Sequence, residues 1–337
     1  MKSGAYSLSI FVDKSKSRKI VFCGSDEIAL PMLEYLNQLQ AISLAGVLSQ
    51  PDRRSGRGKQ LKANPIKQWA KEKDLDVRTP QSPTKYEIDW IKEIDADLVL
   101  VMAYGHILNQ AFLDCTPLGC YNLHASLLPA YRGASPIETS LAIGEKTTGV
   151  TLMRMVMKMD AGPIIGQEKV TISQDDLGST LRTKLAEACI PLIINNLEAL
   201  LSGNRDEKLQ IEEYVTYCRK LKKEDSHLDF SLDAKQLACR VRAFHSWPGS
   251  MFFYNETSLR VGSCKALDDQ GLKPGEIRVE RSELFIGTAK GSLQILQMQK
   301  PGGKMLSTPD FLRGYSLKSG TEIKFFKSEP LISKNFN

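Results

Sequence analysis

Asparagine and histidine side chains stand two residues apart at the end of a short apolar run, Cys120–Leu123. The run predicts a strand, and because alternate side chains of a strand share a face, Asn122 and His124 should point the same way. Open α/β sheets place their ligands at the carboxyl ends of their strands, which is where this pair falls. The chain has four histidines, and His124 is the one whose position favours a functional role.

With a carboxylate nearby, such a pair would suit the transfer of an acyl group to an amine. In that reaction the carbonyl oxygen gains negative charge and protons move between the attacking and departing nitrogens. Asn122 would donate an N–H to the oxygen, and His124 would add a second donor or carry the proton. Asp160 is the candidate carboxylate, because it lies at a turn between two β-like segments, 150–155 and 164–170. From spacing alone, Asp160 could equally be a turn aspartate with a local hydrogen bond.

The elements that must position these residues follow an alternating pattern. Short apolar runs alternate with amphipathic stretches from Lys19 onward, which predicts a doubly wound, Rossmann-like parallel sheet covered by helices. The expected strands are Ile20–Cys23, Ile42–Leu48, Asp97–Ala103 and Cys120–His124, with helices over 27–37 and after Asn64. The turn at Gly24 lacks the G-x-G-x-x-G spacing, so a dinucleotide site is not expected.

A chain of 337 residues predicts two domains. We expect a flexible N-terminal extension over 1–18, a catalytic domain over 19–202 and a polar linker over 203–212. The C-terminal domain, 213–330, is expected to be a small β-barrel of the oligonucleotide-binding type. That expectation depends on regularly spaced short strands, at 250–254, 275–279, 284–287 and 291–298.

The composition, 42% hydrophobic and 25% charged, excludes a disordered or fibrous protein. No apolar run approaches the roughly 20 residues of a membrane span, and no signal peptide is recognisable, so we expect a cytoplasmic protein without a membrane partner. Seven scattered cysteines without a Cys-x-x-Cys pair indicate free core thiols and no metal site.

A glycine-containing loop from Asp52 to Lys62 is strongly basic. Its five cations are Arg53, Arg54, Arg57, Lys59 and Lys62. Such a loop suits contact with phosphates and is expected to stay unstructured until a nucleic acid binds, although a solvated surface loop is the alternative.

Several stretches of this chain together resemble the formyl-folate transferase family. The central one is Asn122-x-His124-x-Ser126-Leu127-Leu128-Pro129, followed by Asp160-x-Gly162. The others are Ile20–Gly24, Ser49–Asp52 with Gly56–Lys59, Val101–Gly105, Arg242–Pro248 and Gln299–Lys304. The resemblance extends from Lys19 to about Tyr315, and within the family the loop and tail stretches are similar to the enzymes that act on tRNA.

The resemblance implies a function and roles for residues. Asn122, His124 and Asp160 would be catalytic. The folate site would comprise Ser126, Leu127, Leu128 and Pro129 together with Ala103, Tyr104 and Gly105. The donor would be 10-formyltetrahydrofolate, and the acceptor the α-amine of initiator methionyl-tRNA, for translation initiation, with no metal. The basic loop would reach the acceptor stem, and the C-terminal domain would also bind tRNA. No obligate protein partner is indicated, which fits a monomer.

Three other functions remain open from the sequence. The same donor could serve a sugar-nucleotide or other amine formyltransferase, including one that acts on glycinamide ribonucleotide, although the basic loop and second domain count against the last. A formyl-folate hydrolase would release formate instead of transferring it. A non-catalytic folate- or RNA-binding protein is disfavoured by the intact Asn122, His124 and Asp160. Assays with a panel of amine acceptors would separate these functions.

Overall fold

The structure, a computed structural model, describes residues 17–55 and 60–335. The chain divides into two compact units, each made of several segments. Unit 1 comprises Met1–Pro129, Gly149–Val170 and Thr183–Tyr214, and unit 2 comprises Ala130–Thr148, Thr171–Arg182 and Val215–Asn337. The expected extension 1–18 lies almost entirely outside the described residues, and the first strand, β1, begins at Arg18. The domain limits inferred from the sequence stay a prediction.

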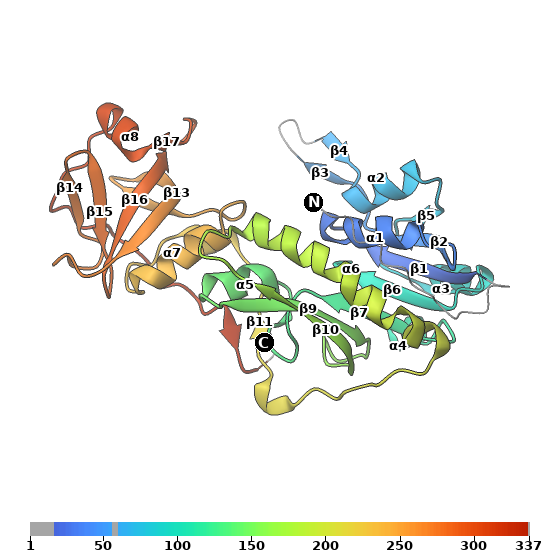
Figure 1. The fold of residues 1–337 in the computed structure, drawn as a ribbon. Helices are drawn as coiled ribbons and strands as arrows, with labels where there is room; N and C mark the ends of the chain where they lie inside the picture. Colours follow the sequence, from blue (N-terminus) through green and yellow to red (C-terminus); the bar gives the residue numbers. More distant parts are fainter. Residues whose placement is uncertain (1–16, 56–59, 336–337) are drawn as a thin grey trace, which may run out of the picture. The chain divides into compact units, whose positions relative to one another are not determined.

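Unit 1 is built on a seven-stranded sheet with the order β10-β9-β7-β6-β1-β2-β5 (Figure 1). Its strands are β1 (Arg18–Gly24), β2 (Ile42–Leu48), β5 (Val77–Arg78), β6 (Leu98–Met102), β7 (Cys120–His124), β9 (Thr147–Arg154) and β10 (Ile164–Thr171). Neighbouring strands from β7 to β5 pair in parallel, whereas β9 pairs antiparallel with β7. The predicted Rossmann-like parallel sheet is confirmed, with an antiparallel addition at one edge.

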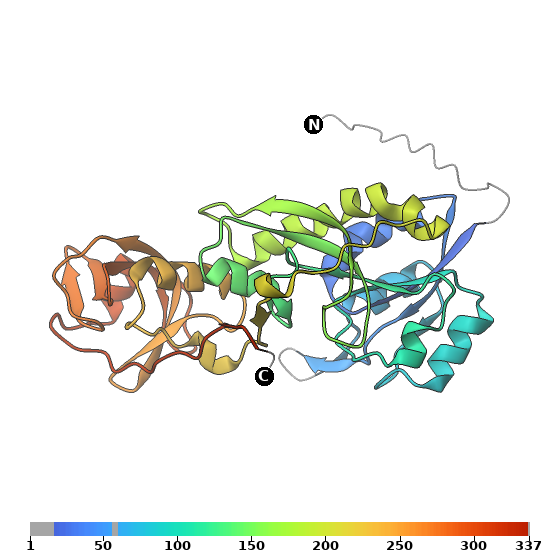
Figure 2. The same ribbon diagram turned by 90° about the horizontal axis from the view of Figure 1, so that it is seen from below.

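Helices cover both faces of this sheet. The helices of the described chain that contribute to unit 1 are α1 (Leu30–Asn37), α2 (Pro65–Glu72), α3 (Lys85–Glu93), α4 (Gln110–Leu113) and most of α6 (Gly178–Ser202). On one face, Val101 of β6 shares a core cluster with Trp90 of α3 and Phe112 of α4. On the other, Cys189 Sγ of α6 lies 3.8 Å from Met102 Sδ of β6. Figure 2 shows α6 on the side of the sheet opposite to α3 and α4.

Side-chain caps fix where α2 and α3 begin. The Asn64 side chain accepts a hydrogen bond from the Lys67 amide at the start of α2 and donates to the Gln50 carbonyl after β2. Thr84 and Glu87 form a reciprocal capping box at the start of α3. Asn64 therefore joins the helix start to the carboxyl end of a strand, and this junction leads into the basic loop.

Unit 2 contains two small sheets and its own core. A three-stranded sheet joins β18 (Ile332–Ser333), β11 (Tyr217–Cys218) and β8 (Arg132–Gly133), and helix α5 (Pro136–Ala142) packs against α7 (Ala234–Ala243). The larger sheet is antiparallel, with the path β12-β13-β16-β15-β14 and β17 beside β16. Its strands are β12 (Met251–Tyr254), β13 (Thr257–Leu267), β14 (Ile277–Glu280), β15 (Glu283–Gly287), β16 (Ser292–Gln299) and β17 (Leu306–Ser307), followed by helix α8 (Thr308–Gly314).

The larger sheet of unit 2 curls around an apolar cluster that includes Phe230, Leu237 and Val261. Among the described residues no pairing joins β12 to β14, so the predicted small barrel takes the form of a half-barrel. The eleven-residue strand β13 was missing from the prediction. Bulges interrupt its pairing with β16 around Ser263, and this irregularity obscures the alternation expected of a strand.

Helix α6 is the one helix of the described residues that is long and apolar enough, by length and composition, to span a membrane. Half of its apolar window is buried inside the protein, as in the core helix of a globular domain. Leu185 and Cys189 of this helix are fully buried. No disulfide joins any of the seven cysteines, which all lie in the described part of the chain, and five of them are buried.

Candidate functional site

The pair predicted at the end of β7 lies beside the predicted carboxylate. His124 Nδ1 is 3.7 Å from Asp160 Oδ2, and their side chains are only 7% and 14% exposed. Asn122, two residues earlier on the strand, is half-buried. In the sheet, Asn122 is paired with Val101 of β6 on one side and with Met153 of β9 on the other. The three residues inferred to act together are therefore grouped at the carboxyl end of one parallel strand.

Asp160 occupies a turn whose backbone is tightly constrained. It adopts a φ of 49°, in the left-handed region that few residues other than glycine, asparagine and aspartate enter. Two residues later, a Cβ on Gly162 would lie 1.7 Å from the Arg154 carbonyl oxygen, so only glycine fits there. The Gln210 side chain donates hydrogen bonds of 2.8 Å to the carbonyls of both Asp160 and Gly162. Backbone contacts thus set the position from which the Asp160 carboxylate approaches His124.

The segment Ser126–Pro129 follows β7 directly and is fastened to β9. Thr151 Oγ1 donates to the Ser126 carbonyl at 2.6 Å and accepts from the Leu128 amide at 3.0 Å. Gln167 of β10 donates both to the Leu128 carbonyl and to Thr151 Oγ1. Ser126 and Leu128 are buried, so the segment has a fixed path immediately beside His124.

Residues 103–105, also expected to line the folate site, follow β6, the strand next to β7. Ala103 and Gly105 both have positive φ, 49° and 74°, and both are exposed, whereas the Tyr104 side chain is buried. Gln50 donates to the Tyr104 carbonyl at 2.7 Å. The exposed backbone at these two turn residues can approach a planar ligand closely, because no bulky side chain rises from either position.

Buried aromatic groups lie next to this turn. The rings of Tyr104 and His106 are in edge contact, with their centroids 4.8 Å apart. Burial raises the pKa of Tyr104, and burial together with the nearby cation Arg53 lowers the pKa of His106. Among the described residues, neither Tyr104 Oη nor His106 Nε2 has a hydrogen-bond partner, although both atoms are buried. Both side chains should therefore remain uncharged near neutral pH.

The basic loop differs from the unstructured segment that we expected. Its flanks, β3 (Arg53–Ser55) and β4 (Gln60–Lys62), form an antiparallel hairpin in which Arg53 is paired with Lys62. Arg53, Arg54 and Lys62 are exposed, and Arg53 also hydrogen-bonds to Gln50 Oε1. Arg57 and Lys59 lie outside the described residues. Short-range pairing across a hairpin supplies order that composition alone does not reveal.

Sequence reasoning missed three residues that shape this site, namely Thr151, Gln167 and Gln210. Thr151 faces His124 in the register of β7 and β9, and this pairing cannot be read from the sequence. Gln210 lies within the segment that we interpreted as a linker, and neighbouring Lys208 pairs with Ile164 of β10. Among the described residues no group of three or more histidine, cysteine or acidic side chains is arranged to hold a metal ion.

Comparison with known proteins agrees with this arrangement. The formyl transferase family model matches residues 18–225, and the model of the formyl transferase C-terminal domain matches residues 220–316. A methionyl-tRNA formyltransferase from Thermotoga sp. (strain RQ2) is 36% identical over 91% of this chain and 98% of that protein. One from Methylococcus capsulatus is 38% identical over 89% of this chain and 97% of that protein.

Solved structures show the same fold at much lower identity. One is WlaRD, a sugar 3N-formyl transferase whose structure was determined in the presence of dTDP and 5-N-formyl-THF. The match covers 86% of this chain and 100% of WlaRD, with 17% identity and a TM-score of 0.63. Another is HypX from Aquifex aeolicus in complex with tetrahydrofolic acid. That match covers 93% of this chain and 51% of HypX, with 16% identity and a TM-score of 0.57. At such identities the likeness supports the fold alone. The sequence matches over both units go further and confirm the resemblance: the chain belongs to the formyl transferase family.

Proposed function

We propose that this protein transfers the formyl group of 10-formyltetrahydrofolate to the α-amine of initiator methionyl-tRNA, giving formylmethionyl-tRNA for translation initiation in the cytoplasm. The observation that carries the proposal is the grouping of His124, Asp160 and Asn122 at the carboxyl end of β7. The relatives named methionyl-tRNA formyltransferase, similar over nine-tenths of this chain, support the choice of acceptor.

In this proposal, His124 and Asp160 handle the proton. Asp160 Oδ2 faces Nδ1 of the imidazole at 3.7 Å, which favours a proton on that nitrogen and leaves Nε2 to act as the base. When Nε2 accepts the proton of the attacking amine, the adjacent carboxylate stabilises the imidazolium that results. The low exposure of both groups strengthens this attraction by excluding water.

Asn122 acts on the oxygen of the formyl group. Its side-chain N–H can donate to the oxygen as negative charge develops there during attack. The side chain is carried by a strand that is paired on both sides, so the amide does not have to reorganise as the charge forms. Removal of one donor of this kind typically costs about a hundred- to a thousandfold in turnover.

The folate donor is held, in this proposal, by the two segments that follow β6 and β7. Residues 103–105 present exposed backbone to the pterin ring, and Ser126–Pro129 forms a fixed wall beside His124. Two structures with the same fold, HypX in complex with tetrahydrofolic acid and WlaRD in the presence of 5-N-formyl-THF, support a folate donor of the formyl group. When bound, the donor supplies the formyl carbon.

The hairpin β3–β4 and unit 2 would bind the tRNA. The hairpin presents Arg53, Arg54 and Lys62 to solvent, and cations of this kind contact phosphates independently of sequence. The match of residues 220–316 to the C-terminal domain of formyl transferases supports a role for unit 2 alongside the catalytic unit. A monomer would be sufficient, because the proposed catalytic residues all come from one chain.

The function is tested by formylation of charged initiator tRNA with 10-formyltetrahydrofolate. Asp160→Asn should lower turnover by about a hundred- to ten-thousandfold, since it removes the charge that supports proton transfer through His124. Asp206→Asn is the matched control, because Asp206 is an exposed aspartate of the same unit. The urea concentration at the midpoint of unfolding should be the same for both variants as for the wild type.

Two results would contradict the proposal. Near-normal turnover by folded Asp160→Asn would remove the carboxylate from the mechanism. Formylation of an amino-sugar nucleotide, with no product on charged initiator tRNA, would assign a different acceptor. Charged elongator methionine tRNA, assayed in parallel, measures selectivity for the initiator.

A further inference from the structure

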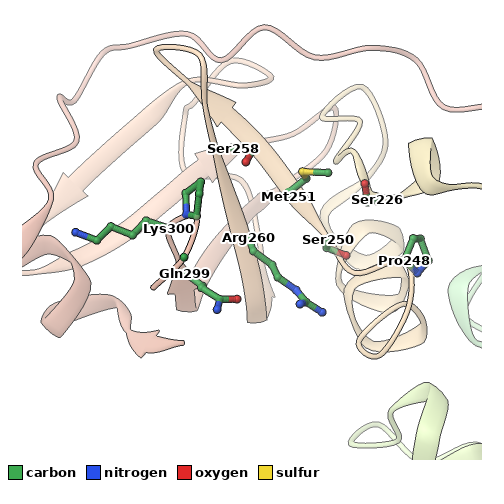
Figure 3. Close-up of a pocket in the computed structure, with 10 residues that line it drawn as sticks. Ser226, Pro248, Ser250, Met251, Ser258, Arg260, Gln299 and Lys300 are labelled. Atoms are coloured by element: carbon green, nitrogen blue, oxygen red, sulfur yellow. The ribbon is translucent and has the colours of Figure 1, made fainter. Parts of the chain in front are cut away.

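Unit 2 contains a pocket that is lined only by residues of that unit. Its volume is about 260 Å³, below the range of about 300–1,000 Å³ typical of sites for drug-sized ligands. The lining residues are Ser226, Pro248, Ser250, Met251, Ser258, Arg260, Gln299, Lys300, Pro301 and Gly302 (Figure 3). None of them is acidic, and two are cations, so the lining favours a small anion.

Backbone pairing brings the walls of this pocket together. The Leu228 amide donates to the Met251 carbonyl, which holds the segment after Ser226 against the start of β12. Arg260 of β13 is paired with Met251 on one side and with Gln299 of β16 on the other. Two of the stretches quoted from the sequence, Arg242–Pro248 and Gln299–Lys304, therefore meet at one place.

One residue of the pocket lining has a buried hydroxyl for which the described part of the chain offers no hydrogen-bond partner. Ser226 is 2% exposed, and among the described residues its Oγ has no hydrogen-bond partner. A buried hydroxyl in this condition lowers stability relative to an apolar side chain of the same size. Its position in the pocket lining means that a bound ligand could supply the missing partner.

Arg260 is the cation that the pocket presents. Figure 3 shows its guanidinium directed toward Ser250 and Pro248, whereas the Lys300 side chain extends the other way. Among the described residues Arg260 donates one hydrogen bond, to the His245 carbonyl at 3.1 Å, and this anchors the group without neutralising it. The remaining N–H groups of a guanidinium match the oxygens of a phosphate.

The carboxylate next to Ser226 in the sequence is already engaged by another arginine. Asp225, next to Ser226, is already paired with Arg219 by two hydrogen bonds of 2.6 and 2.8 Å. It also accepts from the Lys222 amide. With that carboxylate engaged elsewhere, the charge of Arg260 is available to an incoming anion.

We propose that this pocket binds the phosphate group of a nucleotide, with Arg260 pairing the phosphate oxygens and a phosphate oxygen accepting a hydrogen bond from the Ser226 hydroxyl. The phosphate can belong to the backbone of a tRNA or to a free nucleotide. Only the tRNA source rests on the function proposed above. Exposed Trp247, next to Pro248 of the lining, offers a surface for stacking of a neighbouring base.

The test uses the full chain, with uncharged tRNA in a salt series and adenosine 5′-monophosphate as separate probes. Arg260→Gln should bind the probe that occupies the pocket, either tRNA or adenosine 5′-monophosphate, about tenfold more weakly than the wild type does. The reason is the loss of a charge-assisted contact. If the source is tRNA, the dependence of log affinity on log salt should also become shallower by about one unit. Adenosine, which lacks the phosphate, should not bind to the pocket.

Arg281→Gln is the matched control, because Arg281 is an exposed arginine in the turn between β14 and β15 of the same unit. Equal affinities of Arg260→Gln and Arg281→Gln for both probes would overturn the proposal. So would a wild-type protein that binds neither probe.

Ser226→Ala separates binding from folding. It should weaken binding of the same probe, while its melting temperature stays equal to or above that of the wild type, because an unsatisfied buried hydroxyl is removed. Wild-type affinity in this variant would contradict the role of Ser226. Asp160→Asn should keep wild-type binding of both probes, so failure of formyl transfer and failure of this pocket are distinguishable.

Discussion

Several side chains near the candidate site form hydrogen bonds with the backbone of neighbouring segments. Thr151 and Gln167 donate hydrogen bonds to backbone carbonyls of the segment after His124. Gln210 donates a hydrogen bond to the carbonyl of Asp160. A positional error of about 1 Å in a reacting group can cost a hundredfold in rate. Residues of this kind should therefore influence turnover and donor binding without contacting the formyl group.

Thr151→Val should weaken binding of the folate donor by about tenfold. The substitution leaves the buried Leu128 amide without its acceptor, a loss of about 1–3 kcal/mol, and releases the segment Ser126–Pro129 from β9. The measurement is equilibrium binding of 10-formyltetrahydrofolate, with Thr147→Val, an exposed threonine of the same strand, as control. Wild-type donor affinity would show that the hydroxyl does not define the wall of the site.

Asp225 gives unit 2 a dependence of stability on pH. Burial would raise the pKa of this carboxyl, but hydrogen bonds from Arg219 and from the Lys222 amide outweigh burial and lower the pKa. A lowered folded-state pKa means that the pair stabilises the protein above the unfolded value of about 3.9 and that this contribution is lost as pH falls. Asp225→Asn should therefore lower the free energy of unfolding by about 2 kcal/mol at pH 7 and by less below pH 4.

The measurement is urea unfolding of Asp225→Asn at several values between pH 3 and pH 7. Asp268→Asn, an exposed aspartate of the same unit, is the control. A constant difference from the wild type across this range would exclude ionisation of Asp225 as the source of the effect.

Among the secondary-structure elements, strand β7 and the neighbouring strands β6 and β9 determine where the site lies. The location of Asn122 and His124 could be predicted, because a parallel strand and its side-chain alternation are local features of the sequence. The contacts from Thr151, Gln167 and Gln210 could not, since each of these hydrogen bonds joins residues that are between 16 and 50 positions apart in the sequence. Gln210 was hidden further, because composition alone makes residues 203–212 look like a linker.

The hairpin β3–β4 should contribute to tRNA use without affecting the folate site. Replacing Arg53 and Arg54 by alanine should raise the KM for charged tRNA and make the salt dependence of tRNA binding shallower by up to about two units. Lys71→Ala with Lys92→Ala is the control, because both lysines are exposed on α2 and α3 and give the same change in charge. Donor binding is measured in parallel, and its loss would assign the hairpin a structural role.

At the scale of the whole molecule, the two units are interleaved in sequence. Segments 130–148 and 171–182 belong to unit 2 although residues on both sides of each belong to unit 1. Helix α5 lies in the first of these segments and packs against α7, which comes about a hundred residues later. Cutting the chain at one point therefore does not separate the units.

A fragment of residues 19–212 should be less stable than residues 19–337. The fragment keeps α5 and β8 but lacks α7 and β11, so the buried side chains Ile137 and Leu141 lose their cover. Urea unfolding and binding of a hydrophobic dye measure the effect, with the longer chain as control. Equal unfolding midpoints and no dye binding in the fragment would show that the first 212 residues fold independently.

The distribution of tryptophan gives this chain a built-in pair of optical labels. Trp69 and Trp90 are buried in unit 1, whereas Trp247 belongs to unit 2 and is 53% exposed. Indole emission shifts to longer wavelength in water, and an exposed indole is quenched by iodide while a buried one is shielded. Quenchable emission therefore reports on the surface beside Pro248, and shielded emission reports on the core of the Rossmann-like unit. The melting of each unit can be followed separately in the unmodified protein.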